Sequence, residues 1–340
     1  MKILSSVFTG ILALVTGTLA AQKPLSTRLD SLLATKDPRE FNGVVLITQG
    51  NKTLYAKSHG YANRETKQAL SIDDPFIIMS VTKQMTAVLV LQEVEKGHIQ
   101  LQQTLHACLP DIKDRWADSI TIHQLLNHTS GVRWFDEPLA FPPGTQYAYS
   151  NFGYSLLKSV LEHATGKAYT ELAEALFRKC GMKHSGITGH IHAVQGYHET
   201  SSGSLEACTD TIPDWHYAGA GVVSTARDLV RWNELLYGGK LLKDSSYQLM
   251  THAWQHRQHT VYGTMGTGYG IVLSDDKQEM GHTGYMPEPG FTLINFYYPA
   301  TRTSLVVMEN VGYKETDIPR AYAFERSIRE ILLPSVIKQQ

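Results

Sequence analysis

The chain of 340 residues has little net charge, few cysteines and no strongly basic segment. Its formal net charge is −1, so a general electrostatic attraction to nucleic acid or to an anionic membrane is not supported. Only three cysteines are present, Cys108, Cys180 and Cys208, and their spacing does not show whether two of them pair. With so few cysteines the stability of the fold must come from packing, and a composition of 42% hydrophobic and 19% charged residues is ordinary for a soluble globular protein.

The most apolar stretch lies at the N-terminus and is short. A basic Met1-Lys2 end precedes the apolar residues 11–15, and residues 18–21 are small enough for a cleavage site. Gly10 and Gly17 dilute this run, whereas a membrane span needs about 18 or more solidly apolar residues. We therefore expect residues 1–21 to be a cleaved signal peptide, and the mature protein to be periplasmic or secreted without a stable membrane anchor.

Strand patterns occur near both ends of the chain, and helical patterns lie between them. Strands are predicted at 43–49 and 53–60, joined by a tight turn at Gly50-Asn51, and at 278–283, 291–298 and 303–310. Helical periodicity predicts helices at 24–35, 121–128 and 150–166, and a last helix that begins at Pro319 and ends at Pro334.

This order predicts an α/β fold in which one antiparallel sheet is built from both chain ends and flanked by helices. We expect residues 22–100 and 216–340 to form the sheet domain, and residues 101–215 to form an inserted helical subdomain. A chain of this length usually forms more than one packed region. The cleft between the two regions is the default place for a functional site.

Ser80 and Lys83 lie in the first turn of a predicted apolar helix that stops at Gly97. Residues three apart share a helix face, so the Lys83 amine can reach the Ser80 hydroxyl, and the helix N-terminus favours developing negative charge. The same position also suits a helix-capping side chain. Because the S-x-x-K spacing recurs at residues 155–158, 274–277 and 335–338, this pair alone does not identify a nucleophile.

Two further segments supply groups that a serine nucleophile needs, namely a base and donors for the oxyanion. Tyr149 and Asn151 lie in a predicted loop before a helix, where a phenol and an amide can point into a cleft. The segment His282-Thr283-Gly284 lies on a predicted strand, where glycine allows a ligand to approach the backbone closely. Weaker copies of both patterns occur at residues 61–63 and 184–186, but only one ordered set has every member in the required context.

The ordered motifs SVTK (80–83), YSN (149–151) and HTG (282–284) resemble those of the serine β-lactamase and penicillin-binding protein family, in particular its branch of class C β-lactamases, D-amino-acid peptidases and esterases. LLNHTSGV (125–132), PPGTQYAYSNFGYSLL (142–157) and GAGVVSTARDLVRW (219–232) extend the similarity over about residues 25–335.

The resemblance implies a role for each motif residue. Ser80 matches the acylated nucleophile, Lys83 the amine that shares its proton, and Tyr149 the phenol that acts as base and then protonates the leaving group. Lys83 and Tyr149 should titrate as a coupled pair, so the proton acceptor is left open. Asn151 matches the amide that holds the substrate's acyl-side carbonyl. The backbone N–H groups of Ser80 and Tyr285 match the oxyanion hole.

The third motif departs from the family's usual KTG, whose lysine meets the substrate carboxylate. Histidine has a reference pKa of about 6.5 and is mostly neutral at neutral pH, so His282 removes a constant cation. Family members with HTG are commonly esterases, amidases or D-amino-acid peptidases. Tyr285, after Thr283 and Gly284, is bulkier than the small residue usual there and is expected to reshape the mouth of the cleft.

We therefore predict an exported serine hydrolase that forms an acyl-enzyme on Ser80 with small ester, amide or D-amino-acid peptide substrates. A true β-lactamase, a D,D-carboxypeptidase and a penicillin-binding module that is acylated without turnover remain open as alternatives. No cofactor is expected.

Other polar residues favour structural roles. His252 and His256 are four apart on an expected helix, and residues 190 and 192 are a second histidine pair, but neither has a third ligand at diagnostic spacing, so no metal site is expected. His128 is expected to pin the turn after its helix. Thr225 and Asp228 have the form of a capping box.

Overall fold

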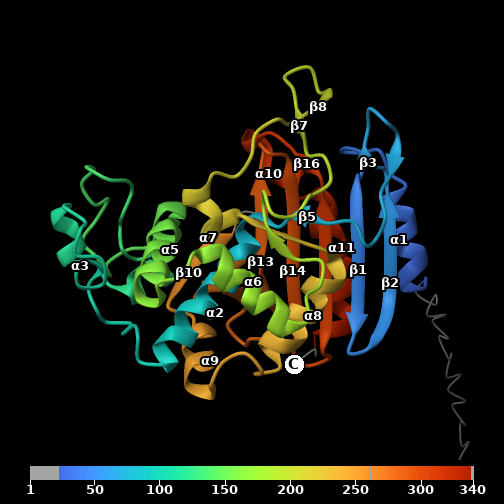
Figure 1. Ribbon diagram of the computed structural model, residues 1–340. Helices are drawn as coiled ribbons and strands as arrows, with labels where there is room; N and C mark the ends of the chain where they lie inside the picture. Colours follow the sequence, from blue (N-terminus) through green and yellow to red (C-terminus); the bar gives the residue numbers. More distant parts are fainter. Residues whose placement is uncertain (1–22, 260–261, 338–340) are drawn as a thin grey trace, which may run out of the picture.

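The computed structural model describes residues 23–259 and 262–337, and it contains an eight-stranded antiparallel sheet. The strand order is β10-β11-β12-β13-β14-β15-β1-β2, and every neighbouring pair is antiparallel. The strands are β1 (Gly43–Gln49), β2 (Lys52–His59), β10 (Gln255–His259), β11 (Gly263–Thr267), β12 (Val272–Leu273), β13 (Met280–Met286), β14 (Phe291–Tyr298) and β15 (Thr303–Glu309). Because β1 pairs with β15, the N-terminal hairpin extends the C-terminal strands, which confirms the predicted sheet (Figure 1).

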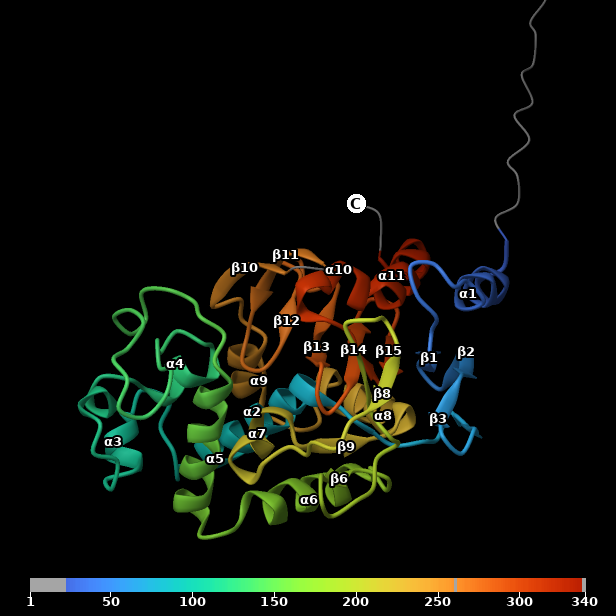
Figure 2. The same ribbon diagram turned by 90° about the horizontal axis from the view of Figure 1, so that it is seen from above.

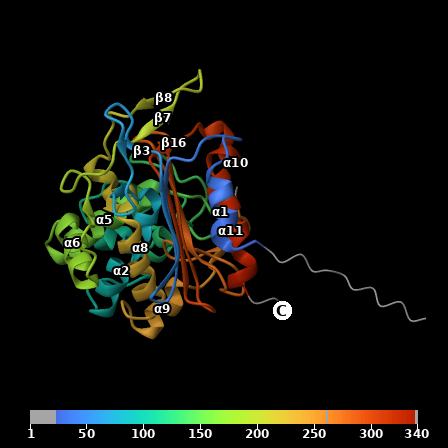
Figure 3. The ribbon, with the colours of Figure 1, turned by 90° about the vertical axis from the view of Figure 1, so that its right-hand side faces the viewer.

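Helices cover both faces of this sheet. α1 (Leu25–Leu33) and α11 (Ala323–Val336) pack together on one face, and α2 (Thr82–Glu95) and α8 (Ala226–Tyr237) lie on the other (Figures 2 and 3). Successive residues of a strand point to opposite faces, so β1 contributes to two cores. Val44 and Leu46 join the core on the α2 side, whereas Val45 and Ile47 join the core on the α1 side. This explains why β1 is a continuous apolar run.

The region expected to be helical contains helices and short strands. Its helices are α3 (Leu105–Cys108), the 3-10 turn η2 (Arg115–Asp118), α4 (Ile122–Leu126), α5 (Asn151–Thr165) and α6 (Tyr169–Cys180), and its strands are β6 (Gly186–Ile187), β7 (Tyr197–Glu199) and β8 (Leu205–Ala207). β6 pairs with β9 (Val222–Ser224), which also pairs with β5 (Phe76–Ile77), and β7 pairs with β16 (Val311–Gly312). The division at 101–215 stays a prediction.

The remaining elements are short connections. They are β3 (Tyr61–Asn63), β4 (Gln68–Ala69), η1 (Met79–Val81), η3 (Asp214–His216), α7 (Tyr217–Ala220), α9 (Asp244–Met250), η4 (Glu315–Asp317) and α10 (Ile318–Ala321). Within the described residues no helix is both long and apolar enough to span a bilayer. The predicted signal peptide at 1–21 lies outside the described residues.

Two predicted helix boundaries can be compared directly with the structure. Gly166 ends α5 with a left-handed φ of 66°, as predicted, because glycine carries no Cβ to oppose that conformation. The last helix does not run from Pro319 to Pro334, because Tyr322 separates α10 from α11 and α11 continues to Val336. Pro334 removes one backbone donor, but buried Leu332 and Val336 still hold the final turn against the core.

The predicted capping box at α8 is only half formed. Thr225 accepts a hydrogen bond from the Asp228 backbone N–H at 3.2 Å and so caps the helix. The Asp228 carboxylate does not return to Thr225, because it accepts from the His184 N–H and the Ser185 hydroxyl, both at 2.8 Å. A complete capping box opens α4 instead, between Thr121 and Gln124.

The three cysteines are unpaired in the structure. Cys108 and Cys180 are buried and Cys208 is partly buried, and each is a free thiol. Burial raises the pKa of each thiol above its usual value, so none of them is an activated thiolate. Their role is therefore structural.

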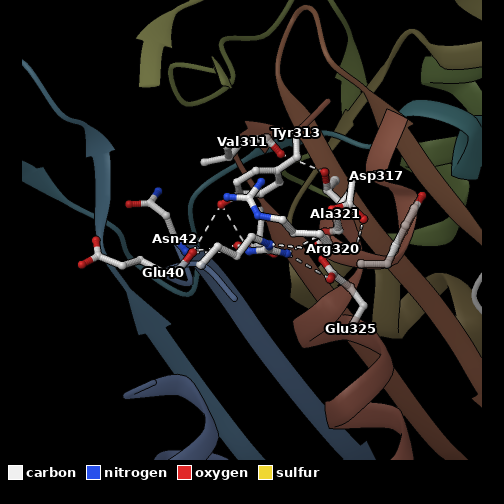
Figure 4. A network of polar contacts seen from close by, with 12 residues as sticks. Glu40, Asn42, Val311, Tyr313, Asp317, Arg320, Ala321 and Glu325 are labelled. Atoms are coloured by element: carbon white, nitrogen blue, oxygen red, sulfur yellow. Dashed lines mark hydrogen bonds and ion pairs between the residues drawn. The ribbon is translucent and has the colours of Figure 1, made fainter. Parts of the chain in front are cut away.

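A buried ionic cluster joins the segment between α1 and β1 to β15 and the C-terminal helices α10 and α11 (Figure 4). Both terminal nitrogens of Arg39 donate to the Glu309 carboxylate, at 2.8 and 2.7 Å, and one also donates to the Ala321 carbonyl at 2.6 Å. Burial and the neighbouring Glu309 raise the pKa of Glu325 well above its usual value, which favours its protonated form. Beside this cluster, the Tyr322 hydroxyl donates to the Gly284 carbonyl at 3.0 Å, which ties the C-terminal helices to the third motif.

Candidate active site

Ser80 lies in η1, at the junction between strand β5 and helix α2. The preceding residue, Met79, has a φ of 46°, a left-handed conformation that a non-glycine residue rarely adopts. This turn, within residues 78–81, redirects the chain from β5 to α2. The Ser80 hydroxyl oxygen accepts a hydrogen bond from the Tyr149 hydroxyl at 2.7 Å, and it lies 3.3 Å from the Lys83 amine. The structure therefore brings the first two predicted motifs together.

Lys83 is fully buried and is held by two fixed acceptors. Its amine donates to the Asn151 side-chain carbonyl at 2.8 Å and to the Gly219 carbonyl at 2.9 Å. Burial lowers the pKa of Lys83 to about 7. A neutral amine has two N–H donors and one lone pair. With both donors engaged by Asn151 and Gly219, the lone pair is free to accept the Ser80 proton.

Gly219 has no room for a side chain at this position. A Cβ atom there would lie 2.8 Å from His216 Cε1 and 3.5 Å from the Lys83 nitrogen. Glycine therefore lets the α7 backbone approach the amine closely enough to accept its hydrogen bond. The segment that begins at Gly219, one of those that extend the resemblance, therefore contacts the site directly.

Tyr149 presents its ring to solvent and its hydroxyl to Ser80. The residue is 37% exposed, yet burial of the hydroxyl raises the pKa of Tyr149 above its usual value of about 10. The Lys83 nitrogen lies 4.9 Å from the Tyr149 ring centroid. In this arrangement Tyr149 keeps its proton at neutral pH, whereas Lys83 is close to half deprotonated.

His128 holds the loop that carries Tyr149. It follows α4 with a φ of 62°, and its carbonyl accepts from the Ala148 N–H at 3.0 Å. Its ring nitrogen Nδ1 accepts from the Ser150 N–H at 3.2 Å, and its ring packs 4.6 Å from the Tyr149 ring. Burial and the nearby cations lower the pKa of His128 well below its usual value, so the ring is neutral and can accept this bond. The predicted pinning role therefore extends to the second motif.

The third motif lies on β13, as predicted, beside η1. His282 is buried, and burial together with the charge of Lys83 lowers the pKa of His282 to about 3. His282 is therefore neutral and does not replace the lysine of a KTG motif. At Gly284 a Cβ atom would lie 2.7 Å from the Ile78 carbonyl oxygen, so glycine permits the close packing of β13 against the turn before Ser80.

Beside the nucleophile, β13 pairs with a described strand on one side only. β12 pairs only with Met280 and Gly281, and within the described residues no strand covers the same edge from His282 to Met286. Tyr285 lies in this stretch, and its hydroxyl donates to the Tyr313 carbonyl. This stretch of β13 carries Tyr285, whose backbone N–H the resemblance matches to an oxyanion donor.

Two residues at this site carried no signal in the sequence. His216 is 3% exposed, its Nδ1 has no hydrogen-bond partner among the described residues, and burial lowers the pKa of His216 to about 4. Arg257, on β10, places its guanidinium carbon 5.9 Å from the Tyr149 ring centroid. Both reach the site from segments far from any motif, so local spacing could not reveal them.

The other histidine and S-x-x-K candidates do not form sites. α9 ends at Met250, so the helix expected to carry His252 and His256 is absent, and His256 lies on β10 and pairs with Asp275 at 2.7 Å. His190 pairs with Glu174 at 2.9 Å. Across residues 23–259 and 262–337 no group of three or more potential metal ligands occurs. At the second S-x-x-K, Lys158 contacts Glu162 and Asp214, not Ser155.

Comparison with known proteins adds relatives with the same fold. Penicillin-binding protein 4* of Bacillus subtilis (strain 168) is 26% identical over 356 residues, which cover 92% of this chain and 76% of that protein. Esterase EstB of Burkholderia gladioli is 29% identical over 203 residues, which cover 48% of this chain and 52% of the esterase. The structure of D-amino acid amidase from Ochrobactrum anthropi SV3, with L-phenylalanine amide, has a TM-score of 0.76 at 21% identity and covers 92% of this chain and 99% of the amidase.

The family assignment rests on most of the chain. Residues 31–329 match the Beta-lactamase family, a span that includes all three motifs and every strand of the large sheet. With the serine, lysine, tyrosine and asparagine assembled as described, the chain belongs to the Beta-lactamase family of serine hydrolases.

Proposed function

We propose that this protein is an exported serine hydrolase that forms an acyl-enzyme on Ser80 with small ester or amide substrates, including D-amino-acid peptides. One observation carries the proposal: the Ser80 oxygen lies between the Tyr149 hydroxyl, at 2.7 Å, and the Lys83 amine, at 3.3 Å. A buried amine with a pKa of about 7 is well matched to general-base work near neutral pH.

Acylation proceeds by nucleophilic substitution at the substrate carbonyl. The Lys83–Tyr149 pair takes the Ser80 proton while the serine oxygen attacks the carbonyl carbon. The backbone N–H groups of Ser80 and Tyr285 donate to the oxyanion, a contribution typically worth about 100- to 1,000-fold in rate for each donor. The tetrahedral intermediate collapses, and the leaving alcohol or amine departs with a proton returned by Tyr149.

Deacylation repeats these steps with water as the nucleophile. Water gives a proton to the Lys83–Tyr149 pair and attacks the acyl carbon. The intermediate then releases Ser80, which regains its proton, and the carboxylic acid product leaves. The net reaction consumes one water and yields one acid and one alcohol or amine.

The substrate class is supported by the site and by the relatives. Neutral His282 gives the third motif no cation of its own, which weakens the case for efficient β-lactam hydrolysis. By their names, one relative is an esterase and one structural neighbour is a D-amino acid amidase. A penicillin-binding module that is acylated without turnover is the second candidate, and the match to penicillin-binding protein 4* over 92% of the chain favours it.

The two candidates differ in the fate of the acyl-enzyme. Wild-type protein and Ser80→Ala are assayed on nitrocefin, short p-nitrophenyl esters, D-alanyl p-nitroanilide and a D-alanyl-D-alanine peptide. A hydrolase turns over at least one substrate, and Ser80→Ala lowers that rate by at least about a thousandfold. Ser274→Ala, which alters another S-x-x-K serine, is the matched control and keeps the wild-type rate. Equal rates for wild type and Ser80→Ala would refute the proposal.

Intact-mass spectrometry over time separates turnover from stable labelling. A penicillin adduct on Ser80 that persists, without steady-state product, supports the penicillin-binding module. The exported location has its own test, because the N-terminal residue of protein recovered from the periplasm or medium should follow residue 21. Recovery of the chain in the cytoplasm with Met1 intact would contradict export.

A further inference from the structure

Exposed aromatic side chains gather beside the site. Three of the five large hydrophobic residues that are exposed in the described part of the chain are neighbours in space, namely Trp134, Phe135 and Trp215. The Trp134 ring centroid lies 5.2 Å from that of Trp215 and 6.2 Å from that of Phe135. Single exposed apolar residues are ordinary, but a contiguous exposed patch is the kind of surface that marks a binding site.

The aromatic cluster continues into a hollow along helix α5. Trp134 and Phe135 pack on Phe152, the second residue of α5, with ring centroids 4.5 and 4.8 Å from it. Beyond Phe135 lies a hollow of about 500 Å³, here named the α5 groove. The α5 residues that line it are Leu156, Ser159 and His163. With Phe152 they follow one another at intervals of three or four residues, so they share one face of the helix.

The opposite wall of the α5 groove comes from the segment after α3, a helix that contacts α5 (Figure 2). This wall is residues 109–114, and its apolar members are Leu109, Pro110 and Ile112. The Asp136 backbone N–H donates to the Asp114 carboxylate at 2.8 Å, which ties this wall to the loop that carries Phe135. Because the walls are joined in the absence of a ligand, binding does not have to order them.

The charges along the α5 groove decide which kind of occupant it suits. Three carboxylates and one amine line it, those of Asp111, Asp114, Asp136 and Lys113. This excess of negative charge repels an anionic membrane surface or an anionic ligand. The floor is apolar, since Leu156 is only 2% exposed. An uncharged chain that lies along the hollow therefore matches both its shape and its lining.

The aromatic cluster begins on the acyl side of the active site. Trp215 precedes His216, whose Cε1 atom would lie 2.8 Å from a Cβ atom on Gly219. The Gly219 carbonyl in turn accepts from Lys83. Asn151, the other acceptor of Lys83, is the first residue of α5, and the resemblance matches it to the amide that holds the acyl-side carbonyl. A chain that leaves the site along α5 consequently belongs to the acyl half of the substrate.

We propose that the α5 groove binds a linear apolar chain on the acyl half of the substrate, guided there by Trp134, Phe135 and Trp215. This inference rests on the proposed hydrolase function and narrows its substrates to esters and amides of alkyl-chain acids. Helical rise of 1.5 Å per residue puts Ser159 about 12 Å along α5 from Asn151. An extended chain advances about 1.2 Å per bond, so a chain of about ten carbon atoms reaches Ser159.

Two esters with the same leaving group isolate the acyl half. p-Nitrophenyl butyrate and p-nitrophenyl decanoate are each kept below the concentration at which they aggregate, and the rate of Ser80→Ala is subtracted. Release of the nitrophenol ends acylation, so kcat/KM reports binding and acylation, and slow deacylation of one acyl-enzyme does not affect it. The quantity compared is the ratio of kcat/KM for the decanoate to kcat/KM for the butyrate.

Wild-type protein is expected to prefer the decanoate at least about tenfold, because each buried methylene is worth about fourfold in binding. Ser159→Trp fills the α5 groove and should lower the ratio about tenfold while the butyrate rate stays unchanged. Ser159 is exposed, so this variant should fold, and Ser159→Ala, which adds no bulk, should keep the wild-type ratio. Phe135→Ala should lower the ratio, whereas Tyr61→Ala, which removes an exposed ring outside the groove, should not.

Three outcomes would overturn the inference. Equal kcat/KM values for the two esters, or hydrolysis of neither by a protein that turns over another substrate, would refute it and leave the proposed function intact. An unchanged ratio in Ser159→Trp would show that the chain does not enter the α5 groove. Failure of the wild-type protein to acylate Ser80 with any substrate would remove the proposed function, and this inference with it.

Discussion

The burial of Lys83 predicts a specific pH dependence of acylation. With a pKa of about 7, the neutral amine rises from roughly 10% of molecules at pH 6 to roughly 90% at pH 8, so kcat/KM should rise about tenfold over this interval. The buried histidines of the site do not produce this inflection, because the pKa values of His282 and His216 are lowered to about 3 and about 4. An inflection near pH 7 would therefore report the Lys83–Tyr149 pair.

Asn151→Asp moves this inflection in a known direction. The substitution places a carboxylate where the amide oxygen now lies, 2.8 Å from the Lys83 nitrogen. At an effective dielectric constant of about 20, a charge pair at about 4 Å is worth about 4 kcal/mol, and one pKa unit corresponds to about 1.4 kcal/mol. Because Asn151 is exposed, solvent screens part of this attraction, and we expect the pKa of Lys83 to rise by about 1–2 units.

The assay is a profile of kcat/KM against pH on an uncharged p-nitrophenyl ester, for wild type, Asn151→Asp and Asn151→Ser. Asn151→Ser removes the amide without adding charge, so its rate falls but its inflection stays within about half a unit of wild type. A wild-type profile that is flat between pH 6 and 8 would refute the assignment of a neutral amine. So would an Asn151→Asp inflection at the wild-type position.

Three further predictions concern buried charge. Burial lowers the folded-state pKa of Lys83 below its unfolded value of about 10.4, so its unfavourable contribution to stability is full below pH 7 and disappears as the pH rises through 10.4. Lys83→Met removes this contribution. Its gain in unfolding free energy over wild type, measured by urea titration, should therefore be about 2–3 kcal/mol larger at pH 6 than at pH 9. Arg39→Met leaves the Glu309 carboxylate buried without its partner and should lower the unfolding free energy by about 3–5 kcal/mol. Adding Glu309→Gln to Arg39→Met should recover most of this stability. An unchanged urea midpoint in Arg39→Met would contradict the prediction. His282→Lys adds a cation beside Lys83 and should move the kcat/KM inflection below pH 7; an unchanged inflection would show that a charge at position 282 does not reach the Lys83 amine.

Most of the fold could be predicted from local sequence patterns. The predicted elements that were wrong are those whose bounds or type are set by tertiary contacts. The central strands β1, β14 and β15 are largely apolar runs that are visible in the sequence, whereas the polar edge strands β10 and β11 gave no such signal and were not predicted. The predicted end of the last helix at Pro334 was wrong because buried Leu332 and Val336, on either side of the proline, hold the final turn against the core. A local sequence rule does not include such contacts. The expected helix at 252–256 was wrong because Gln255 pairs with Thr267 and starts a strand.

The assembly of the candidate catalytic residues in one place could be predicted because each lies in a short motif with a recognisable local structure. A helix start, a loop before a helix and a strand with glycine can all be recognised from neighbouring residues. The groups that set the charge of the site could not be predicted in this way. Gly219 accepts from Lys83 through its backbone, which no side-chain pattern reveals, and Arg257 reaches Tyr149 from the far edge strand.

The charges of Arg257 and Lys83 affect the pKa values of different side chains of the site. Lys83 lowers the pKa of His282 by its charge, so a permanent cation at position 282 would in turn lower the pKa of Lys83. The pKa of Lys83 is lowered by burial alone, and the charge of Arg257 is felt instead at Tyr149, whose pKa it lowers against the effect of burial. A cation on β10 therefore lowers the pKa of the phenol, while the amine stays near the pKa at which it accepts the serine proton.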